Sequence, residues 1–137
     1  MSSAIVDAGP LVAYFKRDEL HHQWSCERLG SLHPPLYSCD SVISEACFLL
    51  RRTQSGVDRL MEFLERGIVS LDFPIGSELP AIRKLLRRYR NVPMSLADAC
   101  LVRMSELLNE PVIVTLDADF KIYRRHRRQV IPLMTPP

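Results

Sequence analysis

The chain has 137 residues, of which 47% are hydrophobic and 25% are charged. This length and composition are typical of one globular domain, here residues 1–137, and exclude a disordered chain. No apolar run approaches the roughly 20 residues of a membrane-spanning helix, and the N-terminus lacks signal-peptide features, so we expect a cytoplasmic protein without membrane contact. The four cysteines have irregular spacing, which predicts reduced thiols rather than a zinc site or a disulfide framework.

Short apolar runs rich in β-branched residues alternate with helical patterns along the whole chain. This alternation predicts an α/β fold with a mainly parallel central sheet. In chain order we expect a strand at 4–6, helices at 10–15 and 21–29, a strand at 36–39, a helix from Asp40 or Ser41 to about Arg52, a helix from Ser55 to Gly67, a strand at 68–71, helices from Ser77 and from Ser95 to about Asn109, a strand at 112–115, a short basic turn or helix at 120–128, and a last strand at 130–133.

Acidic residues follow the predicted strands, at the edge of a parallel sheet where ligands bind in such folds. Four separated segments supply them: Asp7, Glu45, Asp98, and Asp117 with Asp119. Each has an ordinary structural explanation when it is taken alone. Asp7 could accept hydrogen bonds in a turn, Asp98 could form a capping box with Ser95, and Glu45 could favour the positive end of its helix.

Convergence of these acids is harder to explain by folding alone. Carboxylates that are packed into one crevice repel each other unless a cation neutralises them. Glu45 can reach such a crevice, because it lies at the margin of the apolar stripe of its helix, which consists of Val42, Ile43, Ala46, Leu49 and Leu50. Carboxylate oxygens without a His or Cys ligand set favour Mg²⁺, or Mn²⁺, over zinc. Such ions can activate water for attack on a phosphodiester.

Four segments, IVDAGPLVAYF, SVISEACFLL, MSLADACLV and VIVTLDADF, resemble in this order the acidic motifs of PIN domains. The likeness is greatest to VapC-type toxins of toxin–antitoxin pairs. It implies a three-layer α/β/α sandwich, a homodimer, a small antitoxin partner and an RNA substrate. Asp7, Glu45, Asp98 and Asp117 would be the catalytic, metal-binding residues, with the hydroxyl of Thr115 near them.

Two positions depart from the family pattern or vary within it. Asp119 falls where the family varies, so it is either a fifth metal-binding acid, a neighbour of the metal ligands, or a loop residue. Many relatives carry a hydroxyl residue after the first Asp, where this chain has Ala8-Gly9-Pro10. A water or metal contact from that position is therefore not expected.

Ten of the 18 Lys and Arg residues fall into two short stretches, although the net charge is only +2. The first stretch contains Arg83, Lys84, Arg87, Arg88 and Arg90, and the second contains Lys121, Arg124, Arg125, Arg127 and Arg128. A solvated helix face would explain either stretch. The second directly follows the last acidic motif, and we expect it to contact RNA phosphates.

Three other functions compete with a nuclease. A signalling receiver domain would need adjacent acids after the first strand and a lysine after the last strand, and neither is present. A phosphatase could use Asp117-Ala118-Asp119, but that motif should open its fold rather than close it. A PIN domain that binds RNA without cutting it would not need the intact acidic set.

Overall fold

The computed structural model describes residues 2–137. Its centre is a five-stranded sheet of order β3–β2–β1–β4–β7, in which all neighbouring strands are parallel. The strands are β1 (Ser3–Val6), β2 (Leu36–Tyr37), β3 (Val69–Ser70), β4 (Pro111–Val114) and β7 (Leu133–Met134). The predicted α/β class with a mainly parallel sheet is therefore confirmed.

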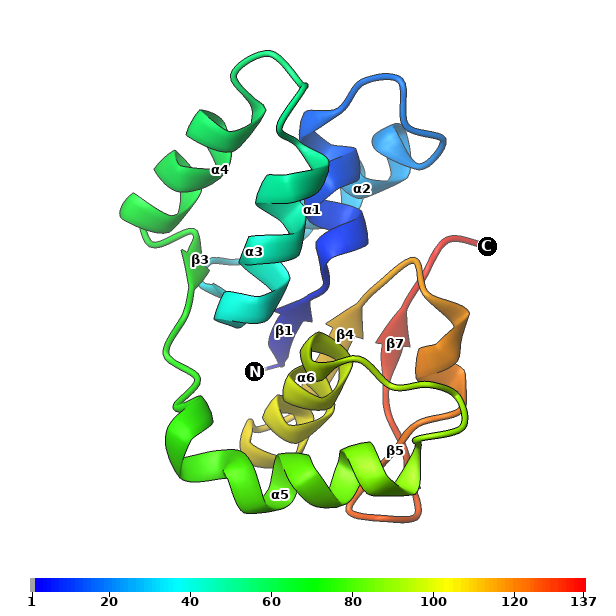
Figure 1. Cartoon of the computed structure of the whole chain (residues 1–137). Coiled ribbons are helices and arrows are strands. Elements are labelled where there is room, and N and C mark those ends of the chain that lie inside the picture. Colours follow the sequence, from blue (N-terminus) through cyan, green and yellow to red (C-terminus); the bar gives the residue numbers. More distant parts are fainter. Residues whose placement is uncertain (1) are drawn as a thin grey trace.

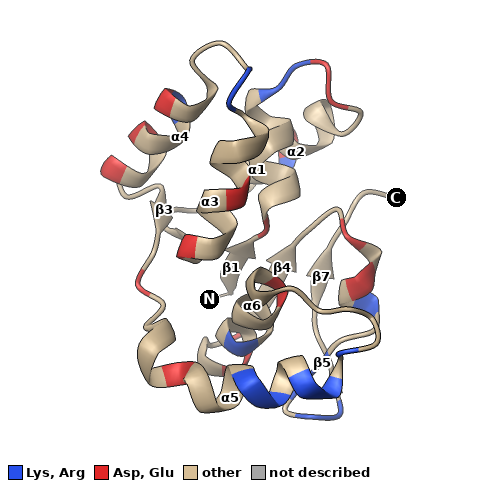
Figure 2. Cartoon of the chain, in the orientation of Figure 1, with Lys and Arg blue, Asp and Glu red and all other residues tan. Residues whose placement is uncertain are grey.

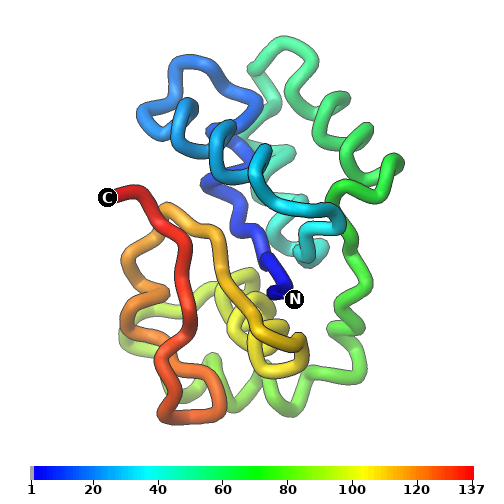
Figure 3. The backbone as a smooth tube through the Cα atoms, turned by 180° about the vertical axis from the view of Figure 1, so that it is seen from behind, coloured from blue at the N-terminus to red at the C-terminus, as the bar shows by residue number. Residues whose placement is uncertain are grey.

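Six α-helices connect and cover the strands (Figure 1). They are α1 (Ala8–Phe15), α2 (His22–Ser31), α3 (Asp40–Leu49), α4 (Gly56–Glu65), α5 (Ile75–Arg88) and α6 (Leu96–Leu107). Helix α6 lies in front of the sheet in Figure 1, whereas α2 is nearest the viewer from behind in Figure 3. The sheet thus lies between helical layers, as in an α/β/α sandwich. None of the described helices is long and apolar enough to cross a membrane.

Strand β1 lies at the middle of the sheet because both of its faces are apolar. Ile5 and Val6 are fully buried, and β1 pairs with β4 through four residues in register. Ile113 and Val114 of β4 are equally buried. Continuous apolar runs of this kind are typical of parallel strands that helices cover on both sides.

The C-terminal segment differs most from the sequence-based expectation. Instead of one strand at 130–133, the structure has β6 (Gln129–Val130) in an antiparallel hairpin with β5 (Arg124–Arg125), followed by β7 in the main sheet. Pro132 separates β6 from β7, because proline has no N–H to donate to a strand neighbour. The predicted basic element at 120–128 is a 3₁₀ helix, η1 (Ala118–Lys121), that leads into this hairpin.

Most helix boundaries agree with the pattern, with shifts of a few residues. Helix α5 begins at Ile75 rather than Ser77, and the Ser77 hydroxyl donates to the Pro74 carbonyl at 3.0 Å within the first turn. Helix α3 ends at Leu49, before the predicted end near Arg52. Helix α2 continues through Gly30 to Ser31. These shifts leave the order of strands and helices unchanged.

Replacement of the β4 residue Ile113 by Ala should destabilise the fold by about 2–5 kcal/mol, because it opens a cavity beside the central strand. Val130→Ala is the control, since Val130 is 68% exposed, and it should change stability by less than about 0.5 kcal/mol. Urea unfolding followed by circular dichroism measures both. Equal midpoints for the two variants would contradict the central position of β4.

Candidate acidic site

All five acids that the sequence predicts for the site line one cavity of about 540 Å³. They are Asp7, Glu45, Asp98, Asp117 and Asp119. The rest of the lining is mostly apolar or small: Ala8, Gly9, Leu49, Pro93, Ser95, Ala97 and Leu116. The structure therefore brings together residues that are up to 112 positions apart in the sequence, from Asp7 to Asp119.

The sheet topology explains this convergence. From β1 the chain moves outward to β2 and β3, and it returns on the other side of β1 as β4. The loops after β1 and β4 therefore diverge from a common point, which is where open α/β sheets bind ligands. Asp7 directly follows β1 and is the N-cap of α1, and Asp117 follows β4 as the N-cap of η1.

The Asp7 side chain is held at this point by two hydrogen bonds. Its Oδ1 accepts from the backbone N–H of Ala8 at 2.8 Å, and its Oδ2 accepts from the Thr115 hydroxyl at 2.7 Å. Thr115 Oγ1 in turn accepts from the N–H of Asp117 at 3.0 Å. One buried hydroxyl thus ties the acid after β1 to the loop after β4.

Burial raises the pKa of Asp7 from its ordinary value of 3.8 to about 6. The hydrogen bonds from Thr115 and Ala8 oppose this increase, and the negative charges of Asp98 and Glu45 add to it. In the same way, the charge of Asp117 raises the pKa of Asp119. The carboxylates are therefore close enough to destabilise one another's ionised forms.

Asp98 caps helix α6 and also lines the cavity. It forms a capping box with Ser95 at the start of α6, as its ordinary structural explanation requires. Its Oδ2 also accepts a hydrogen bond from the Tyr123 hydroxyl at 2.8 Å. Tyr123 is fully buried and packs against the rings of Tyr89 and Phe120. Sequence reasoning missed Tyr123, because no motif or spacing distinguishes it from a core aromatic residue.

The other walls of the cavity differ in exposure. Glu45 and Asp117 are exposed, and Asp117 Oδ1 accepts a hydrogen bond from the N–H of Asp119 at 2.9 Å. The helical spacing predicts Leu49 within the apolar stripe of its helix, and this is wrong: Leu49 is 45% exposed and lines the cavity, whereas its neighbour Leu50 is fully buried. A Cβ on Gly9 would lie 3.2 Å from the Leu116 side chain, so Gly9 permits the close approach of α1 to the loop after β4.

With this geometry in view, comparison with protein families gives one decisive result. The model of the PIN domain matches residues 4–125, which is most of the chain. The chain belongs to the PIN domain family. PIN domains are generally nucleases that act on RNA, and they typically depend on divalent metals. Comparison with curated proteins gives no match.

The donor chemistry of this PIN domain fits a hard divalent cation. The five acids supply carboxylate oxygens, and no His or Cys lines the cavity. Among residues 2–137, none of the five forms an ion pair with Lys or Arg. In the described part of the chain, no three His, Cys, Asp or Glu side chains are arranged so that they could hold a metal ion together. The cavity is thus an open, uncompensated group of negative charges.

The segment that we expected to contact RNA divides into two groups. Arg124 and Arg125 are half-buried, with the Arg124 guanidinium donating to the Lys121 carbonyl and the Arg125 guanidinium to the Ser105 carbonyl. Their guanidinium groups therefore hold the local fold. Lys121, Arg127 and Arg128 are exposed. Lys121 also lies beside Asp117 in a small neighbouring cavity.

The raised pKa of Asp7 makes stability depend on pH. The native state binds this proton more tightly than the unfolded chain, so the free energy of unfolding falls as pH rises from about 4 to about 6. Asp7→Asn removes this titration. Its stability relative to the native sequence should therefore rise by up to about 3 kcal/mol between pH 4 and pH 7, as urea unfolding can measure.

The matched control is Asp58→Asn, which changes an exposed acid in the first turn of α4. This variant removes one carboxylate that does not line the cavity, so it controls for the loss of a single surface charge. A constant difference for Asp7→Asn would contradict the buried, charge-repelled state of this carboxyl.

Proposed function

We propose that this PIN domain is a metal-dependent endoribonuclease that hydrolyses RNA phosphodiester bonds. Asp7, Glu45, Asp98 and Asp117 are its metal-binding catalytic carboxylates, and Asp119 is a fifth acid at the rim. One observation carries the proposal: carboxylates from four chain segments line one cavity, and no described cation neutralises them. Stability alone gives no reason for such an arrangement, because it costs electrostatic energy.

Mg²⁺ or Mn²⁺, when bound, would activate water and stabilise the negative charge that develops on the scissile phosphate. The side chains of the site prepare this chemistry in two ways. Asp7 and Asp98 are fixed by donors from Ala8, Thr115 and Tyr123. Asp117 is held by the N–H of Asp119, whereas Glu45 is exposed and can turn toward a cation that binds.

We propose further that the protein is the toxin of a VapBC-type toxin–antitoxin pair and acts as a homodimer. This rests on the likeness of its acidic motifs to VapC-type toxins. The structure adds exposed apolar side chains beside the cavity, on α3 and α6: Phe48 is 60%, Leu49 45% and Leu96 46% exposed. Exposed apolar side chains of this size suit a protein partner. The alternative is an RNA-processing nuclease, or an RNA-binding protein, that is not a toxin.

Toxicity can be tested separately from the chemistry. A short antitoxin-like reading frame beside the gene supports the toxin role, and so does growth arrest that co-expression of that frame relieves. Normal growth during expression of the protein alone would contradict the toxin role and leave RNA cleavage unaffected.

Asp98→Asn should lower RNA cleavage at least about 100-fold in Mg²⁺ or Mn²⁺, because it removes one charged ligand of the cation. The increase in melting temperature on addition of Mg²⁺ should shrink in the same variant. Asp58→Asn, which lies outside the cavity, should retain both properties. Cleavage that persists in EDTA, or in Asp98→Asn, would contradict metal-dependent hydrolysis.

Tyr123→Phe should lower cleavage about 10-fold, because it removes the hydroxyl that orients Asp98 Oδ2 and leaves the ring in place. Tyr89→Phe is the matched control, since Tyr89 belongs to the same aromatic cluster but its hydroxyl accepts from the Arg124 N–H. Mg²⁺ affinity from calorimetry should fall in the first variant and not in the second. Equal effects in the two variants would contradict a positioning role for Tyr123.

A further inference from the structure

The two basic stretches of the sequence lie side by side in the structure. The backbone N–H of Arg124 donates to the Tyr89 hydroxyl at 3.0 Å, and the rings of Tyr89 and Tyr123 pack edge to face at 5.1 Å. Figure 2 shows the basic residues of α5 next to those of the β5 segment. Eight exposed side chains make up this basic surface: Arg83, Lys84, Arg87, Arg88, Arg90, Lys121, Arg127 and Arg128.

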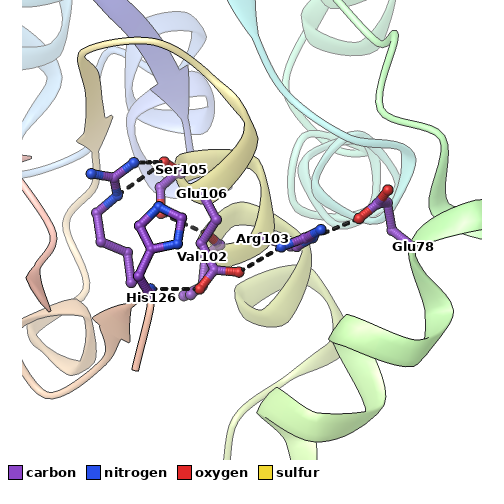
Figure 4. A network of polar contacts seen from close by, with 7 residues as sticks. Glu78, Val102, Arg103, Ser105, Glu106 and His126 are labelled. Carbon is purple, nitrogen blue, oxygen red and sulfur yellow. Dashed lines mark hydrogen bonds and ion pairs between the residues drawn. The ribbon is translucent and has the colours of Figure 1, made fainter. Parts of the chain in front are cut away.

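Helix α6 holds both halves of the basic surface in place through one polar network (Figure 4). Arg103 of α6 pairs with Glu78 of α5 and, at 3.1 Å, with Glu106. Glu106 accepts from the backbone N–H of His126 in the hairpin turn at 2.7 Å. The guanidinium of Arg125 donates to the Ser105 carbonyl. The helix and the hairpin are thus fixed to the same support.

This network also explains why the surface has one sign of charge. Glu78 and Glu106, the acids nearest to it on α5 and α6, are engaged by Arg103 and are only 17% and 9% exposed. No acidic residue occurs at 79–91 or at 120–137. Within residues 2–137, none of the eight cations forms an ion pair. Folding alone leaves their charges uncompensated.

The basic surface begins where the acidic cavity ends. Arg90 precedes the cavity residue Pro93 by three positions, and Lys121 follows the cavity residue Asp119 by two. The hydrogen bond from Tyr123 to Asp98 joins the hairpin to the cavity wall directly. Lys121 of the basic surface also lines a small cavity together with Asp117, so a polyanion on this surface reaches the rim of the acidic cavity.

We propose that the basic surface binds the phosphate backbone of RNA that flanks the cleaved bond and so aligns a long RNA with the acidic cavity. This rests on the proposed nuclease function. Arg83 to Arg88 span about 8 Å along α5, and Arg90 follows the end of the helix, which suits an extended row of charges rather than a single anion. The rings of Tyr89, Phe120 and Tyr123 are buried or half-buried and are not available for base stacking, so contacts from the exposed cations to phosphates dominate. Recognition through phosphates should be independent of sequence and sensitive to salt.

Two double variants test the two halves of the surface. The first is Arg87→Gln with Arg88→Gln on α5. The second is Arg127→Gly with Arg128→Gln in the hairpin, where Arg127 has a φ of 72°, a conformation that favours glycine. Removal of the charge at 127 should therefore not lower the melting temperature. Arg28→Gln with Arg66→Gln is the control, because it removes the same charge from exposed positions on α2 and next to α4.

Binding of a labelled stem-loop RNA is measured by fluorescence anisotropy in EDTA, which prevents metal-dependent cleavage, at several salt concentrations. Each surface variant should lower affinity several-fold at about 0.1 M salt and reduce the slope of log K against log salt by about one for each phosphate that the variant no longer neutralises. The control should bind like the native protein. Surface variants with native affinity and slope would overturn the proposal.

Two further arms separate this proposal from its alternatives. Cleavage of an RNA that is too short to reach the surface should be equal in native protein and surface variants. Weakened stem-loop binding in a protein that cuts no RNA supports the surface and refutes the nuclease. Displacement of the RNA by poly-glutamate at a lower charge concentration than by unlabelled RNA would overturn the proposal in favour of an acidic protein partner.

Discussion

Electrostatic repulsion inside one cavity is the constraint on which the site depends. Asp7 is buried at the end of the central strand, and the charges of Asp98 and Glu45 raise its pKa further. A side chain in such a place loses solvation and gains like-charged neighbours. The parallel sheet, with buried residues such as Ile5 and Ile113 on its central strands, provides the stability that offsets this cost. The stability of the sheet therefore permits a cavity whose clustered carboxylates are unfavourable in themselves.

Hydrogen bonds fix Asp7, Asp98 and Asp117, whereas Glu45 is exposed and can move. Thr115 and Ala8 hold Asp7, Tyr123 holds Asp98, and the N–H of Asp119 holds Asp117. Such a site holds some of its cation ligands in a fixed orientation and lets Glu45 adjust to the bound cation. This is useful where a cation or a substrate must bind and leave repeatedly. The orientation of Asp98 depends on the aromatic packing of Tyr123, so the core below the site determines the geometry of this carboxylate.

Much of the fold and the site could be predicted from the sequence, because both depend on local patterns. Alternating strand and helix signals gave the parallel sheet, and acids at strand ends gave the cavity residues. The hairpin was missed because its left-handed turn residues, His126 and Arg127, lie in a basic stretch without a strand pattern. Pro132 divides what looks like one apolar strand at 130–133. Tyr123 was missed because its role is set by a partner 25 residues away. Contacts of that kind arise only from tertiary structure.

The last strand of the sheet supports the acidic cavity from a distance. Strand β7 pairs with β4, and the N–H of Thr115 donates to the carbonyl of Met134 at 3.1 Å. Thr115 is the residue that links Asp7 to the loop of Asp117. Loss of the pairing between β7 and β4 would therefore loosen the acidic site, although no residue of β7 lines the cavity.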